Sequence, residues 1–176
     1  VVAYEQGHHP EAVSNPPALL VIGMDGGRVQ TRDKQGENGS RWREDKVCAM
    51  TSYLPGDGTA DHPPEPLVTT YVATMGDAEA FGKLVRLEAE RRGLRQASTV
   101  IVMGDGGNWI DPLNKRQRLA DQRIVDYYHA AEHLHEAARA AAGKDTSESA
   151  TLAAQLEDHL WDGETAEVIA ILAGHA

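Results

Sequence analysis

The sequence predicts an α/β protein in which helices pack on a mixed sheet. Short apolar runs with polar or glycine-rich ends, such as residues 19–24 and 98–103, indicate buried strands. From Asp77 onward the apolar residues instead recur at helical spacing, and helices alternate with strands until about residue 127. Three early strands followed by alternating helices and strands favour an antiparallel meander continued by crossover units.

The first half of the chain is rich in turn signals. Glycines directly after the apolar run, at Gly26 and Gly27, are typical of a hairpin turn. We therefore expect, in order, an irregular lead-in (1–18), a strand (19–24), a turn (25–27), a second strand (28–32), a polar loop (33–40) and a third strand (42–53).

The second half begins with a loop containing four prolines and two glycines, over residues 55–66. Asp77 can cap the helix that follows, and Gly93 can end it. The spacing then predicts an edge strand (67–73), a helix (77–93), a strand (98–103), a short helix (113–120), a strand (123–127) and three helices (128–142, 147–160 and 164–172).

The composition excludes some classes of protein. No apolar run is long enough for a membrane span and no signal segment opens the chain, so we expect a protein of the cytoplasm. Cys48 permits no internal disulfide, and its apolar surroundings indicate a small buried side chain rather than a nucleophile. The chain begins at Val1 and ends inside a predicted helix, so we expect it to be a piece of a longer protein.

The net charge of −10 does not indicate a nucleic-acid partner, but the charged residues are unevenly distributed along the chain. Residues 144–176 carry one basic and seven acidic side chains, whereas residues 77–143 carry ten of each. Taken alone, the local cluster Lys115, Arg116 and Arg118 is better explained as a solvated helix face, but its position soon after Asp105 makes it the candidate for contacts with a DNA backbone.

The most informative feature is a repeated pattern at two strand ends. The apolar run 19–24 is followed by Asp25-Gly-Gly, and the run 100–103 by Gly104-Asp105-Gly-Gly. Neighbouring strands would place Asp25 and Asp105 side by side, and two close carboxylates repel unless a cation neutralises them. Oxygen ligands favour Mg²⁺ or Mn²⁺. Each segment alone is better explained as a turn, but two copies, each following a buried strand, favour a metal pair.

A third feature is the segment DYYHAAEHLH over residues 126–135. Asp126 ends the last predicted strand, while His129, Glu132 and His133 fall on one helix face. The H-x-x-E-H pattern also matches inverted zinc peptidases, in which His129 and His133 would hold Zn²⁺ and Glu132 would be the general base. That alternative leaves the third zinc ligand unidentified and gives Asp25 and Asp105 no role.

Four segments together resemble one known family: DGGRVQ (25–30), WREDKV (42–47), VMGDGGNWI (102–110) and IVDYYHAAEHL (124–134). In this order they resemble DDE transposases of bacterial insertion sequences, in the ISKra-type group related to Mutator-like elements. The similarity covers most of residues 19–172. It implies an RNase H-like core, and it divides the chain into the lead-in (1–18), a partial catalytic core (19–143) and the start of a helical insertion (144–176).

The resemblance also implies roles for residues. Asp25 and Asp105 would be the first two catalytic acids and would bind Mg²⁺ (or Mn²⁺), and Asp126 and His129 would match the family's supporting (Cys/Asp)-x-x-His signature. The partners would be transposon-end and target DNA, with a homo-oligomer in the active complex. The family's third acid follows the helical insertion, so we expect it beyond Ala176. The other hypotheses are the zinc hydrolase and an inactive transposase remnant.

Overall fold

The computed structural model describes residues 16–34, 37–54 and 65–175. Most of the predicted lead-in (1–15) and of the predicted proline-rich loop (55–64) lie outside the described residues. The chain forms two compact units, residues 1–124 and 125–176, which are described separately here.

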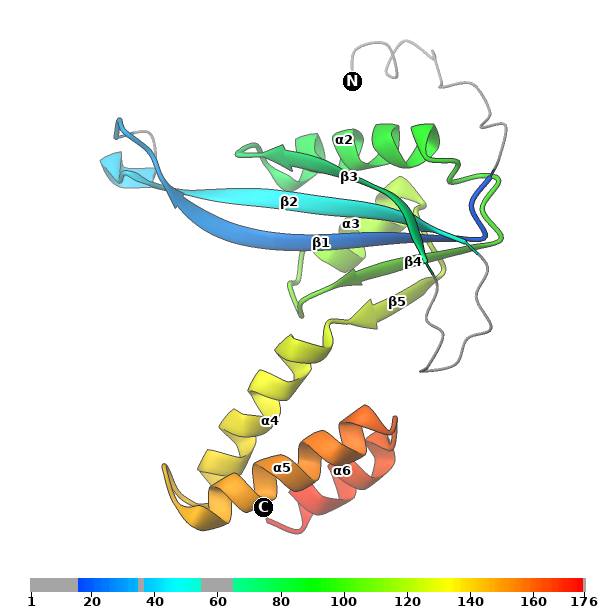
Figure 1. Ribbon diagram of the computed structural model, residues 1–176. Coiled ribbons are helices and arrows are strands. Elements are labelled where there is room, and N and C mark those ends of the chain that lie inside the picture. Colours follow the sequence, from blue (N-terminus) through cyan, green and yellow to red (C-terminus); the bar gives the residue numbers. More distant parts are fainter. Residues whose placement is uncertain (1–15, 35–36, 55–64, 176) are drawn as a thin grey trace. The chain divides into compact units, whose positions relative to one another are not determined.

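The first unit contains a five-stranded sheet with the strand order β3-β2-β1-β4-β5 in the described part of the chain (Figure 1). Its elements are β1 (Leu19–Gln30), the short helix η1 (Glu37–Gly39), β2 (Trp42–Tyr53), β3 (Pro66–Thr74), α2 (Ala78–Arg91), β4 (Thr99–Gly104), α3 (Ile110–Gln117) and β5 (Gln122–Val125), whose last residue falls in the second unit.

The strand directions match the predicted meander and crossover. β1 pairs antiparallel with β2 along its whole length, and β2 pairs antiparallel with β3. β4, which follows the helix α2, returns parallel to β1 from Leu19↔Thr99 to Met24↔Gly104. This order and these directions are those of an RNase H-like α/β fold, so the predicted fold class is confirmed. The weakly patterned edge strand over 67–73 is also present, as β3.

The predicted turn at residues 25–27 is wrong, because β1 is one continuous strand through Gly26 and Gly27. Side chains of other elements occupy the space beside these glycines. A Cβ at Gly27 would lie 2.9 Å from Oδ1 of Asp45, and one at Gly26 would lie 3.6 Å from the Trp109 ring. Glycine in a strand can mark close approach by other groups rather than a turn, and this holds for Gly27, whereas the contact at Gly26 is an ordinary van der Waals distance.

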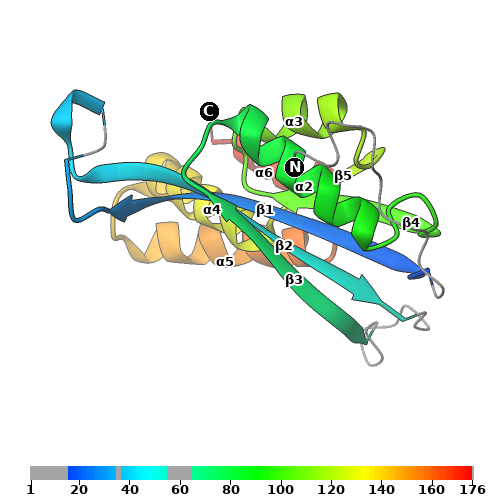
Figure 2. The same cartoon turned by 90° about the horizontal axis from the view of Figure 1, so that it is seen from above.

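The core of the first unit lies on one face of the sheet. Residues at alternate positions of β1 and β2 are fully buried there, and α2 and α3 cover them with apolar side chains. Figure 2 shows α2 running across the strands on that face. The largest fully buried side chains of this core are Phe81, Leu20, Ile22, Met50, Ile110, Val85, Val102 and Cys48.

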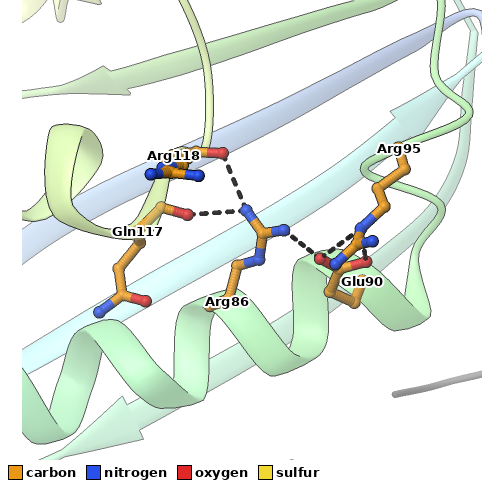
Figure 3. A network of polar contacts seen from close by, with 5 residues as sticks. All are labelled: Arg86, Glu90, Arg95, Gln117 and Arg118. Atoms are coloured by element: carbon orange, nitrogen blue, oxygen red, sulfur yellow. Dashed lines mark hydrogen bonds and ion pairs between the residues drawn. The ribbon is translucent and has the colours of Figure 1, made fainter. Parts of the chain in front are cut away.

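A polar network joins α2 to the end of α3 (Figure 3). Arg86 donates from Nη1 to the carbonyls of Gln117, at 2.7 Å, and Arg118, at 2.8 Å. Its other terminal nitrogen pairs with Glu90, whose carboxylate also accepts from Nε of Arg95 at 3.0 Å. The side chains of Arg86 and Glu90 are 12% and 7% exposed, so the ion pair is largely shielded from water. Through the two carbonyl contacts of Arg86, the pair holds the end of α3 against α2.

The helix α3 begins three residues earlier than predicted. Pro112 lies in its first turn, where the missing N–H is not needed for a helical hydrogen bond. Ile110, fully buried, fixes the start of the helix in the core. Arg118, in the left-handed conformation with φ of 49°, ends it.

The second unit is all helical and consists of α4 (Tyr127–Ala142), α5 (Ser147–Trp161) and α6 (Thr165–Ala173). Its own small core is built from Leu134, Ala138, Leu152, Ala153, Leu156 and Val168. Side-chain caps fix two of the helix starts, since Asp126 accepts from the His129 N–H and Thr146 from the Ser149 N–H. Within the described residues, no helix is both long enough and apolar enough to cross a membrane.

Candidate functional site

Asp25 and Asp105 lie at neighbouring positions at one edge of the first unit. The last paired residues of β1 and β4 are Met24 and Gly104, and each aspartate is the next residue of its chain. Because β1 and β4 are parallel, both carboxylates follow directly at the point where the pairing of the two strands ends. Beyond this point β1 continues and pairs only with β2. The two aspartates therefore lie where β4 leaves the sheet.

Each carboxylate is held by one backbone N–H that follows it. Oδ1 of Asp25 accepts from Gly26 at 2.7 Å, and Oδ1 of Asp105 accepts from Gly107 at 2.9 Å. Among the described residues, neither carboxylate has an ion-pair partner and neither Oδ2 has a hydrogen-bond partner. Asp25 is exposed and Asp105 is half-buried, so one oxygen of each side chain remains available to a ligand.

The glycines around Asp105 are required by close contacts. A Cβ at Gly104 would lie 2.5 Å from the carbonyl oxygen of Met24 and 2.8 Å from Ile110, so only glycine lets β4 approach β1 here. A Cβ at Gly107 would lie 2.8 Å from Oδ1 of Asp105. The Gly-Asp-Gly-Gly segment thus closes tightly around the carboxylate.

Arg123 is a positioning residue that the sequence analysis did not single out. Its Nη2 donates to the carbonyl of Asp105 at 2.7 Å, and its Nη1 pairs with Asp111 at 2.9 Å. It therefore ties the loop after β4 to the first turn of α3 and to β5. A lone arginine in a short strand gives no signal in the sequence, because its contacts are to a backbone carbonyl and a distant carboxylate.

Asp45 is a further acidic residue that the analysis missed. It is paired in register with Gly27, which places it diagonally across the strands from Asp25 on the same face of the sheet. Its Oδ1 is buried without a hydrogen-bond partner in the described structure. In the sequence, the only indication of a role for Asp45 is its position within the WREDKV segment (42–47).

The predicted DNA-contacting residues lie on and just after α3. Lys115 and Arg116 are exposed in its last turn, and Arg116 makes a long contact of 3.9 Å with Glu79. Arg118 is exposed as well, and its backbone carbonyl belongs to the Arg86 network. The three cations thus occupy an exposed segment about ten residues beyond Asp105 in the chain.

Asp126 and His129 belong to the second unit. Asp126 immediately follows β5, as predicted, and its carboxylate caps α4. His129 and His133 lie on one helix face, with their Nε2 atoms 3.1 Å apart and Nδ1 of His133 3.1 Å from Glu136. Glu132 is exposed on the same helix.

Two observations concern the predicted metal site and the predicted burial of Cys48. Within the described residues, no group of three or more His, Cys, Asp or Glu side chains is arranged to hold a metal ion. Cys48 is fully buried, which confirms the prediction of a buried side chain. Burial raises the pKa of its thiol to about 12, and the negative charge of Glu88 adds to the effect, so the nucleophilic thiolate is suppressed.

Comparisons with known proteins give one structural similarity. No family model and no curated protein matches the sequence. Among solved structures, a chain of the Drosophila P element transposase strand transfer complex matches over 72% of this chain, with a TM-score of 0.39 and 12% sequence identity. The matched part is 30% of that chain, so the present chain spans less than a third of the protein it matches.

Proposed function

We propose that this chain carries part of the catalytic core of a DDE-type transposase of a bacterial insertion sequence, which cleaves DNA strands and transfers them with the help of Mg²⁺ or Mn²⁺. Asp25 and Asp105 are the first two of its catalytic acids. The observation that carries the proposal is the register of β1 and β4, in which Met24 pairs with Gly104 and the two acids follow side by side.

The donor set fits a hard divalent cation. Each carboxylate keeps one oxygen without a partner in the described structure, and no described cation neutralises either side chain. Carboxylate oxygens are the ligands that Mg²⁺ and Mn²⁺ prefer. When bound, such ions activate a water or a 3′-hydroxyl as the nucleophile and neutralise charge on the leaving oxygen of a phosphodiester.

The chain's own residues position the reacting groups. Gly26 and Gly107 orient the two carboxylates through their N–H groups, and Arg123 fixes the backbone at Asp105. Lys115, Arg116 and Arg118 contact the DNA backbone. Asp126 and His129 support the site, as the family resemblance implies.

The test is strand cleavage by the natural full-length protein. Asp25→Asn and Asp105→Asn should each abolish Mg²⁺-dependent nicking of DNA that carries the element's ends, because asparagine removes the charge that binds the cation. Asp158→Asn, an exposed change on α5, is the matched control and should cleave as wild type. Cleavage retained by either active-site variant would refute the assignment.

The zinc hydrolase remains a second candidate because the Nε2 atoms of His129 and His133 lie 3.1 Å apart, close enough to share one zinc ion. Stoichiometric zinc that is lost in the His133→Ala variant, together with hydrolysis that does not require Asp25, would favour it. Absence of nicking by the natural full-length protein would instead favour an inactive remnant.

A further inference from the structure

The end of the β1–β2 pair projects from the sheet as a two-stranded ribbon. β4 leaves β1 after Met24, and β3 leaves β2 at Lys46, whereas β1 and β2 stay paired as far as Gln30↔Trp42. Figure 1 shows these two strands extending together beyond the other strands. We call residues 25–30 and 42–47 the ribbon, of which residues 27–30 and 42–45 pair only with each other. It begins at Asp25, so it starts at the proposed catalytic edge.

One face of the ribbon forms the wall of a cavity. The register puts Arg28 opposite Glu44 and Gln30 opposite Trp42, so these side chains alternate onto the same face as Lys46. The turn between β3 and α2 provides the facing wall. The cavity has a volume of about 580 Å³, and it is lined by Arg28, Asn38, Ser40, Trp42, Arg43, Glu44, Lys46, Met75, Gly76 and Asp77.

The charges in this cavity leave one cation available. Lys46 is 5% exposed and pairs with Glu44 at 3.0 Å, while Arg43 donates to the carbonyl of Met75 at 3.0 Å. The carboxylate of Asp77 accepts from the Ala80 N–H at the start of α2. Arg28 has no hydrogen-bond or ion-pair partner among the residues that the structure describes, so its guanidinium is available to an anion.

An aromatic side chain stands in the same cavity. Trp42 is 52% exposed, and within the described residues its ring stacks on no other aromatic ring. A rigid strand holds it, so little side-chain entropy is lost when a flat ligand stacks on it. Indole rings stack with any nucleobase, and arginine binds the neighbouring phosphate.

The surrounding charge favours the same ligand. All six basic side chains of residues 1–76 fall between positions 28 and 46, together with only four acidic ones, although the chain as a whole carries −10. Arg32 and Arg41, farther along, are exposed and have no partner within the described ranges. A polyanion is therefore attracted to this segment although the chain as a whole is negatively charged.

We propose that the ribbon cavity binds a single-stranded stretch of DNA, with one base stacked on Trp42 and its phosphate on Arg28. The inference rests on the proposed function, which supplies the DNA. Arg28 is three residues along β1 from Asp25, or about 10 Å at the rise of a strand. Successive side chains of a strand face opposite sides, so Asp25 and Arg28 lie on opposite faces of the ribbon. An unpaired end of more than about three stacked nucleotides is therefore needed to pass from the cleavage point to the cavity.

The test measures DNA binding without catalysis. Binding of the chain to fluorescent DNA is followed by anisotropy in EDTA, with a duplex carrying a short single-stranded overhang and a blunt duplex of equal length. The overhang DNA should bind more tightly. Trp42→Ala should weaken its binding between about fivefold and a hundredfold, the range for loss of one stacked base, with less than twofold change for the blunt duplex. Trp42→Phe should restore most of the loss.

Arg28→Gln gives a separate readout. It should lower the slope of log affinity against log salt by about 0.7 on the overhang DNA, the value for one lost phosphate contact on a single strand. Trp161→Ala, at another exposed tryptophan, on α5, and Arg91→Gln, at an exposed arginine on α2, are the matched controls and should bind as wild type.

Equal affinity for the two DNAs, or overhang binding by Trp42→Ala that equals wild type, would overturn the inference. Its failure is distinct from failure of the proposed function. If the full-length protein cleaves DNA and Trp42→Ala binds the overhang as wild type, the proposed function stands and the inference about the ribbon is wrong. If the chain binds the overhang through Trp42 and the full-length protein does not nick DNA, the inference stands and the proposed function is wrong.

Discussion

Glu90→Gln should destabilise the first unit strongly, because it leaves the Arg86 guanidinium buried without its counter-charge. Glu90 is 7% exposed and Arg86 is 12% exposed, so water cannot readily replace the lost carboxylate. Breaking one partner of such a pair costs about 3–5 kcal/mol. We expect the lower end of this range, about 3 kcal/mol, because glutamine keeps an oxygen that can accept a hydrogen bond.

The assay is chemical denaturation of the chain, supported by thermal melting. A loss of about 3 kcal/mol corresponds to a fall in the midpoint of about 10 °C for a protein of this size. Glu79→Gln is the control on the same helix, because its contacts with Lys83 at 3.4 Å and Arg116 at 3.9 Å are exposed. An exposed pair contributes less than about 1 kcal/mol.

A double-mutant cycle completes the prediction. Arg86→Met with Glu90→Leu should cost less than the sum of the two single changes by at least about 1 kcal/mol, because removing both charges leaves neither one buried alone. The reasoning would be refuted if Glu90→Gln lost no more stability than Glu79→Gln, or if the two single changes were additive.

Three further predictions follow from close contacts and burial. Gly104→Ala should destabilise the first unit by about 2 kcal/mol or more, because its Cβ would overlap a backbone oxygen, whereas Gly26→Ala should be nearly neutral in the same denaturation experiment. Cys48 should resist alkylation in the native protein and react in urea, and the free energy of unfolding should fall as the pH rises from about 9 towards 12, because only the unfolded thiol ionises there. Fast native labelling would contradict this. Arg123→Gln should raise the Mg²⁺ concentration for half-maximal cleavage by about tenfold, since it frees the backbone at Asp105; an unchanged Mg²⁺ dependence would exclude the positioning role.

The sequence predicted the order of the elements because each signal is local. Helical spacing with a capping Asp77 predicted α2, and an apolar run followed by Gly-Asp-Gly-Gly predicted β4. The fold class follows from that order, since few arrangements bury three early strands and a crossover helix on one core. The roles of Asp25 and Asp105 as metal ligands stay predictions.

Other features depend on contacts between residues that are far apart in the chain. Asp25-Gly-Gly has the composition of a turn, yet β2 pairs through it, and the side chains of Asp45 and Trp109 fill the space beside the glycines. The cavity beside Trp42 exists only because the turn before α2 faces the ribbon.

The sequence by itself determined the order of most strands and helices, and it placed Asp25 and Asp105 directly after the apolar runs of the two central strands, although it predicted a turn where β1 in fact continues. Only the tertiary structure decided that Arg123 holds the Asp105 backbone and that β1 runs on past Asp25 as a ribbon. It also decided that Arg86 is paired, whereas Arg28 has no partner among the described residues. The physical reason is that local patterns fix backbone conformation, whereas the partner of a charge and the room beside a glycine are set by which segments meet in space.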